Sequence, residues 1–98
     1  MIVVREVFQL HFGKAREAIA LVKEMMAASP EMGAGTTRVL TDAVGRYYTL
    51  IMESEHEDLA AFEKSMSEES GGEEMRDLYL RFIPLVMEGR REIYRIVE

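Results

Sequence analysis

The chain has 98 residues, a net charge of −6 and no cysteine. A chain of this length makes one domain, so residues 1–98 are expected to form a single unit. The absence of cysteine excludes disulfides, thiolate zinc sites and a thiol nucleophile. The negative charge argues against a nucleic-acid partner, because such partners are held by basic surfaces.

The first residues predict neither a signal peptide nor a membrane span. The apolar start is interrupted at once by Arg5 and Glu6, and no later apolar run approaches the length of a membrane-crossing helix. We therefore expect a cytoplasmic protein with no membrane partner. No metal and no cofactor is expected either, since the chain has no histidine pair at metal spacing, no glycine-rich phosphate loop and no nucleophile elbow.

Residues 2–10 predict a strand whose even-numbered side chains, apolar except for Glu6, share one face. Both faces are rich in apolar residues, which indicates a central strand. After Gly13, apolar residues at helical spacing predict a helix that ends at Ser29 and Pro30. A loop leads from there to the next strand.

Residues 36–53 predict a β-hairpin. Asp42 and Gly45 fit the first and fourth positions of a type I turn, and the three-residue loop that this implies places Asp42 opposite Arg46. In this register Arg38 lies on the same side as Tyr48. A slip by one residue would exchange the two faces of the hairpin.

The two faces of the hairpin differ in character. One carries Leu40, Leu50 and Met52 and suits contact with helices. The other is rich in β-branched and aromatic residues and poor in charge, so we expect it to be covered. Since a chain this short cannot cover both faces itself, we expect a homodimer. The predicted dimer interface consists of Val39, Thr41, Tyr47, Thr49 and Ile51.

The rest of the chain predicts two helices and a last strand. Ser54 begins a capping box that would start the first helix directly after the hairpin, and Ser70 begins a second capping box. Pro84 is expected to kink or end the second helix. Gly89 is then a natural helix stop, and residues 90–97 alternate as a strand.

The resulting order is β-α-β-β-α-α-β, which is that of a ferredoxin-like α+β fold. Such a fold has a four-stranded antiparallel sheet with helices on one face. The other face is left bare, in agreement with the hairpin pattern. Two sheets packed back to back would close a barrel between subunits, a dimeric α/β barrel.

Three stretches carry a resemblance to a known family: REVFQLHFGK (residues 5–14), VLTDAVG (residues 39–45) and GRREIY (residues 89–94). They resemble the dimeric α/β-barrel superfamily, and within it small proteins of the NIPSNAP type. The resemblance implies a homodimer sharing a β-barrel, with a cleft in each subunit between sheet and helices. The superfamily includes cofactor-independent monooxygenases of aromatic polyketides or quinols, haem-degrading enzymes and members with no known activity.

The candidate ligand-binding residues are Glu6, His11, Arg38, Tyr48, Tyr79 and Tyr94. Glu6 falls on the helix-facing side of its strand, where an unpaired carboxylate would be costly. A carboxylate, a guanidinium and phenols in an apolar cleft would suit a small apolar ligand with a polar head. The alternative, which we favour, is a salt bridge at a strand end together with ordinary tyrosines. His11 is more simply a surface histidine than a ligand.

Three functions follow in order of preference. The first is a dimer that binds a small apolar or aromatic ligand between sheet and helices. The second is a cofactor-independent monooxygenase for an aromatic or quinol-like compound, in which Tyr48 or Tyr79 orients the substrate and Glu6 or His11 moves a proton. The third is haem handling. Haem-degrading relatives use a Trp, an Asn and a His in the cleft, and this chain has no Trp and no Asn.

Overall fold

The computed structural model of the chain describes residues 1–29, 38–69 and 72–98. Four strands form one sheet in the order β2-β3-β1-β4, and each neighbouring pair is antiparallel. The central position of β1 agrees with the apolar residues on both of its faces. The strands are β1 (Ile2–Leu10), β2 (Arg38–Thr41), β3 (Thr49–His56) and β4 (Val86–Arg95).

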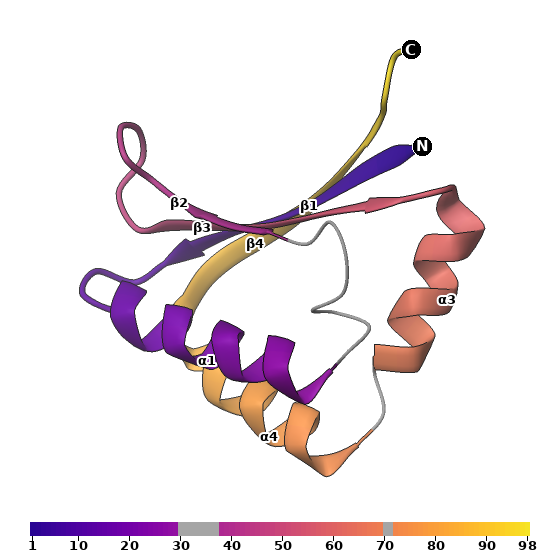
Figure 1. Cartoon of the computed structure of the whole chain (residues 1–98). Coiled ribbons are helices and arrows are strands. Elements are labelled where there is room, and N and C mark those ends of the chain that lie inside the picture. The colour runs from indigo at the N-terminus through magenta and orange to yellow at the C-terminus, as the bar shows by residue number, and fades with distance from the viewer. Residues whose placement is uncertain (30–37, 70–71) are drawn as a thin grey trace.

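Three helices lie on one face of this sheet (Figure 1). They are α1 (Ala15–Ala28), α3 (Leu59–Glu69) and α4 (Glu73–Phe82). A 3-10 turn, Ile83–Leu85, follows α4 and contains Pro84, which fits the start of such a turn because no backbone donor is needed there. Pro84 thus marks the end of the helix, as its sequence position predicts.

Two apolar clusters pack between the helices and the sheet. The larger one lies under α1 and α4, and in it the rings of Phe8 and Phe82 meet edge to face at 5.2 Å between centroids. The smaller one, under α3, consists of Ile2, Val4 and Phe62. The buried residues of the larger cluster are Leu10, Ala18, Leu21, Val22, Met25, Leu50, Leu78, Phe82 and Leu85.

The loop between β2 and β3 is longer than the predicted turn. Asp42 pairs with Thr49 instead of Arg46: its carboxylate accepts a hydrogen bond from the Thr49 N–H at 2.9 Å, and its own N–H donates to the Thr49 carbonyl at 3.3 Å. The Thr49 hydroxyl donates to the Arg46 carbonyl at 2.9 Å. Tyr48, at the end of the loop, has a φ of 59°. The loop therefore holds residues 43–48, three more than the predicted three-residue loop.

This longer loop exchanges the two faces of β2. A register shift by an odd number of residues moves every side chain of a strand to the opposite face. Val39 therefore lies opposite Met52, and Thr41 opposite Leu50. Both face the helices, so the prediction that Val39 and Thr41 lie on the face away from the helices, with the other predicted interface residues, is wrong.

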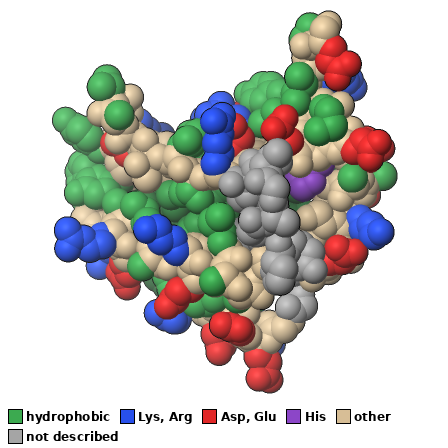
Figure 2. Space-filling model, viewed as in Figure 1, with side chains coloured by type: hydrophobic (Ala, Val, Ile, Leu, Met, Phe, Trp, Pro, Cys, Tyr) green, Lys and Arg blue, Asp and Glu red, His purple; other side chains and the backbone are tan. Residues whose placement is uncertain are grey.

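The sheet face away from the helices is called the open face below. Thr49 and Ile51 lie on it as predicted, and Arg38 lies on it instead of on the helix side. The outline of the molecule dips between its two raised ends at this face (Figure 2). Its side chains include Val3, Arg5, Val7, Gln9, Arg38, Leu40, Thr49, Ile51, Glu53, Glu88, Arg90, Glu92 and Tyr94.

The start of α3 also differs from the prediction. β3 continues through Ser54, so this residue lies in a strand and caps no helix. Asp58 takes the capping role, since its carboxylate accepts a hydrogen bond from the Ala61 N–H at 2.8 Å. The second predicted capping residue, Ser70, lies outside the described residues.

Gly89 lies within β4, opposite Phe8 of β1, and does not end a helix. A Cβ at this position would stand 3.0 Å from Cδ1 of Phe8. The glycine therefore makes room for the phenylalanine ring against the sheet. β4 begins three residues earlier, at Val86.

Candidate functional site

Glu6 lies on the helix-facing side of β1, as alternation predicts. In the register of β1 and β4 it stands opposite Arg91, whose Nε–H donates to its carboxylate. The guanidinium of Arg91 also lies over the Phe62 ring, 5.1 Å from the centroid. A carboxylate and a cation–π contact therefore hold the same guanidinium in place.

A histidine meets the same aromatic ring from β3. His56 packs against Phe62 in an edge-to-face arrangement with 5.2 Å between centroids. Its Nε2 lies 2.9 Å from the hydroxyl oxygen of Ser54, which is two residues earlier on the same face of the strand. The ring of Phe62 thus brings an imidazole and a guanidinium, each with its own polar partner, into one group.

We call this group the Phe62 cluster; its members are Glu6, Ser54, His56, Phe62 and Arg91. Phe62 itself is 8% exposed and anchors the cluster to the small apolar core. The side chains of Glu6 and Arg91 keep 24% and 45% of their exposure. The polar groups are therefore held in position but stay accessible.

The Phe62 cluster can serve a ligand through two polar groups. The ring is 8% exposed and carries the Arg91 guanidinium over its face, so it positions these groups and is itself covered. The imidazole can donate or accept a hydrogen bond. The guanidinium has five N–H donors, of which Glu6 engages one. This set suits a molecule with one hydroxyl or carbonyl group.

The structure brings only one of the six predicted ligand residues, Glu6, into this cluster. Arg38 and Tyr94 lie on the open face, because they stand opposite Glu53 and Val3. Tyr79 is on α4 with 58% exposure. The predicted cleft therefore does not assemble from the residues first assigned to it.

His11 and Tyr48 lie at the other end of the sheet. His11 follows the last residue of β1, and its N–H donates to the Leu85 carbonyl at 3.0 Å. The ring of Tyr48 packs edge to face against Phe12 at 5.1 Å. Both are remote from the β1 residues that surround Phe62, so they cannot act together with Glu6.

The sequence carries signals for the members of the Phe62 cluster that the predicted site does not include. Ser54 and His56 are two residues apart and share a face of any strand that continues past Glu53, whereas the capping-box pattern predicts a helix start at Ser54. A register of β1 and β4 that pairs Phe8 with Gly89 also pairs Glu6 with Arg91. A bulky aromatic residue facing a strand glycine was the available indication of that register.

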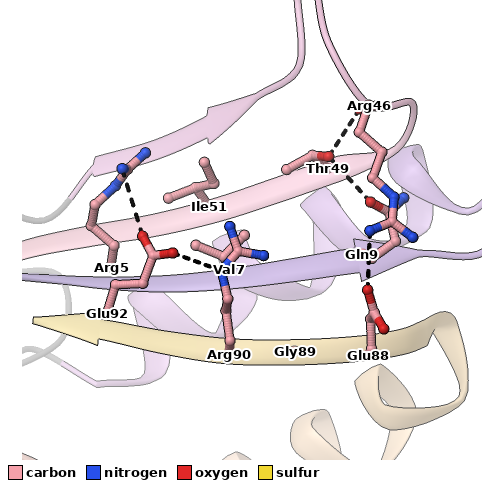
Figure 3. A pocket seen from close by; sticks show the side chains of 10 residues that line it. All are labelled: Arg5, Val7, Gln9, Arg46, Thr49, Ile51, Glu88, Gly89, Arg90 and Glu92. Carbon is pink, nitrogen blue, oxygen red and sulfur yellow. Dashed lines mark hydrogen bonds and ion pairs between the residues drawn. The ribbon is translucent and has the colours of Figure 1, made fainter.

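A hollow on the open face is the second candidate region. Its volume is ≈ 440 Å³, within the range of roughly 300–1,000 Å³ that small-molecule sites have. Val7 and Ile51 line it from adjacent strands (Figure 3). The other lining residues are Arg5, Gln9, Arg46, Thr49, Glu88, Gly89, Arg90 and Glu92.

Beside this hollow, ion pairs form a ladder across all four strands. Arg38 of β2 contacts Glu53 of β3 at 2.6 Å, and Glu53 lies 3.4 Å from Arg5 of β1. On β4, Glu92 lies 3.8 Å from Arg5 and 2.6 Å from Arg90. The hydrogen bond from Arg90 lowers the pKa of the Glu92 carboxyl, although desolvation opposes this shift.

Within residues 1–29, 38–69 and 72–98, no group of three or more His, Cys, Asp or Glu side chains is arranged to hold a metal ion. In the same part of the chain no helix is both long and apolar enough to cross a membrane.

The fold is shared with several solved structures. A NIPSNAP family protein from Agrobacterium tumefaciens superposes with a TM-score of 0.86 at 17% identity, covering 99% of this chain and 93% of its own. A NIPSNAP-like domain protein from Burkholderia xenovorans gives 0.86 at 18% identity, covering 98% and 84%. An antibiotic biosynthesis monooxygenase gives 0.74 at 13% identity and covers both chains fully. No protein-family model and no curated protein sequence matches the chain.

These likenesses confirm the fold. The chain has the ferredoxin-like α+β subunit fold seen in NIPSNAP structures, as the sequence resemblance implies. The antibiotic biosynthesis monooxygenase structure has the same fold. At these identities the likeness concerns architecture, and the chemistry has to be argued from the side chains of this chain.

Proposed function

We propose that the chain is the subunit of a homodimer that binds a small aromatic compound at the Phe62 cluster, between the sheet and α3. The observation that carries this proposal is the Phe62 ring with His56 and Arg91 on it, 5.2 Å and 5.1 Å from its centroid. An aromatic ligand would lie at the accessible side of this cluster, next to the imidazole and the guanidinium. Its polar group would bond to the imidazole or the guanidinium.

The homodimer is supported by the composition of the open face. Val7 is 6% exposed there, and Ile51 and Leu40 are half-buried. The charges between them are largely paired within the face, as in the contact between Arg90 and Glu92. Such a face can pack on a second copy with a lower desolvation cost than a face of unpaired charges.

The binding site is tested with 2-naphthol, which is fluorescent, flat and carries one hydroxyl. We expect saturable binding to the wild-type protein and at least a tenfold loss of affinity in His56→Ala. His11→Ala is the matched control, because it removes the other histidine at the far end of β1 and should leave the affinity unchanged. Equal affinities of both variants and the wild type would contradict the proposed site.

Cofactor-independent oxygenation is the second candidate function, favoured by the shared fold with an antibiotic biosynthesis monooxygenase. The reaction would insert one oxygen atom of O2 into an activated methylene of an anthrone-like substrate and release the other as water, with the substrate supplying the electrons. His56, oriented by Ser54 at 2.9 Å, is the available base for the first proton transfer.

Oxygen uptake with 1,8-dihydroxyanthrone tests this second function. We expect uptake above the spontaneous rate for the wild type and for His11→Ala, and a loss of at least tenfold for His56→Ala. Binding of the anthrone with no increase in oxygen uptake would leave the chain as a binding protein and exclude the oxygenase for this substrate.

A further inference from the structure

The ladder on the open face carries an excess of positive charge. It contains three arginines, Arg38, Arg5 and Arg90, and two glutamates, Glu53 and Glu92. The remaining pair that lines the hollow, Arg46 with Glu88 at 3.1 Å, is balanced. The lining of the hollow therefore holds one more arginine than glutamate.

Arg5 is the member of the ladder with the weakest pairing. Glu53 forms hydrogen bonds with Arg38, and Glu92 forms one with Arg90. Arg5 lies 3.4 Å and 3.8 Å from these carboxylates. Its buried Nε lies 3.4 Å from Oε2 of Glu53 and, among the described residues, makes no hydrogen bond. Arg5 is therefore held by ion pairs at these longer distances, and a guanidinium with five N–H donors can still bind a further acceptor.

The hollow next to Arg5 places charged and apolar side chains side by side. Arg5 and Arg90 stand on adjacent strands, and Val7 and Ile51 lie between the polar residues (Figure 3). At the other end the Gln9 amide donates to the Tyr48 carbonyl at 3.2 Å, which fixes that end of the hollow. A guanidinium matches a carboxylate in shape as well as in charge.

We propose that this hollow binds a small carboxylate with an apolar body. The carboxylate supplies the missing negative charge beside Arg5 and Arg90, and the apolar body lies on Val7 and Ile51. The proposal rests on the proposed homodimer in one respect: a second copy packed on the open face would enclose the hollow and remove it from water. Enclosure raises the need for charge compensation, because charges interact more strongly in a water-poor space.

The test compares benzoate with benzamide, which has nearly the same shape and no charge. Methyl resonances of Val7 and Ile51 report on the open face, and those of Val4 and Leu50 report on the helix side. We expect benzoate to shift Val7 and Ile51 in a saturable manner, with an affinity at least tenfold higher than that of benzamide. Arg5→Met should reduce the benzoate affinity at least tenfold, and the matched change Arg76→Met on α4 should leave it unchanged.

If Arg5→Met does not fold, the benzoate affinity of Arg90→Met is measured in its place, and it should fall in the same way. Equal affinities for benzoate and benzamide, shifts confined to Val4 and Leu50, or no shifts at all would each overturn the proposal. Light scattering on the same samples separates it from the proposed homodimer. A monomer that binds benzoate at Val7 would overturn the homodimer alone, and a dimer without benzoate binding would overturn the carboxylate site alone.

Discussion

Leu50 has the most completely buried side chain of β3, with a relative exposure of 0%. It belongs to the larger apolar cluster under α1 and α4. We expect Leu50→Ala to lower the free energy of unfolding by about 2–5 kcal/mol, through lost transfer energy and the cavity left behind. Val44→Ala is the control, because Val44 is 99% exposed in the loop and its truncation should change stability by less than about 0.5 kcal/mol. Urea denaturation measures both.

The stability of the fold should depend on pH through Glu92. The hydrogen bond from Arg90 lowers the pKa of this carboxyl in the folded state. A lowered folded-state pKa means that the pair stabilises the fold above the ordinary glutamate pKa of about 4.3, and that this contribution is lost as the pH falls through the folded-state pKa.

Thermal unfolding of Glu92→Gln measures this effect. The variant should melt below the wild type at pH 7, and the difference should shrink as the pH falls below about 4. Glu63→Gln on α3 serves as a control at an exposed position. A melting difference that is constant from pH 7 to pH 2.5 would show that the carboxylate charge is not the cause.

The contact between Gly89 and Phe8 decides how closely two neighbouring strands, β4 and β1, can pack. An added methyl at position 89 would stand 3.0 Å from the Phe8 ring, which itself packs on Phe82 of α4. We expect Gly89→Ala to destabilise the fold by about 1–3 kcal/mol, as overpacking does. Phe8→Leu removes the clash, so the double variant should lose less than the sum of the two single changes. Additive losses would show that the clash is relieved by other movements.

Most elements follow from local patterns in the sequence, and the differences have physical causes. Alternation places Glu6 on the correct face because β1 pairs without a register shift from Ile2 to Gln9. The same reasoning fails for Arg38, because its side depends on how many residues the loop after Asp42 holds. Asp42 and Gly45 satisfy the local rules of a short turn, but the bonds from Asp42 to Thr49 favour a longer one.

The Phe62 cluster could be predicted only in part for the same reason. Its carboxylate, Glu6, is visible in the alternation of β1. Its histidine and arginine come from β3 and β4, and their meeting at one ring depends on two strand registers and on the placement of α3. Local sequence does not contain these long-range pairings. The ion-pair ladder on the open face joins four strands, so the pattern of the hairpin alone does not predict it.

At the scale of the whole molecule, the homodimer is the central prediction. Light scattering at micromolar concentration should give twice the chain mass of 11.2 kDa. Ile51→Asp adds an unpaired charge to the middle of the open face and should convert the dimer to a folded monomer. Leu80→Asp adds the same charge at a 54% exposed position on α4 and should leave the dimer intact. A wild-type monomer at this concentration would contradict the shared-barrel arrangement.

The division of the apolar interior into two clusters has a consequence for how the proposed aromatic ligand would reach the Phe62 cluster. Among its described side chains, α3 buries only Phe62 deeply, whereas α1 buries four side chains in the larger cluster. Local unfolding of α3 should therefore cost much less free energy than global unfolding. Amide hydrogen exchange in α3 should be faster than in α1, and a bound aromatic compound should slow it. An aromatic molecule would then enter when this helix detaches and would be retained when it returns.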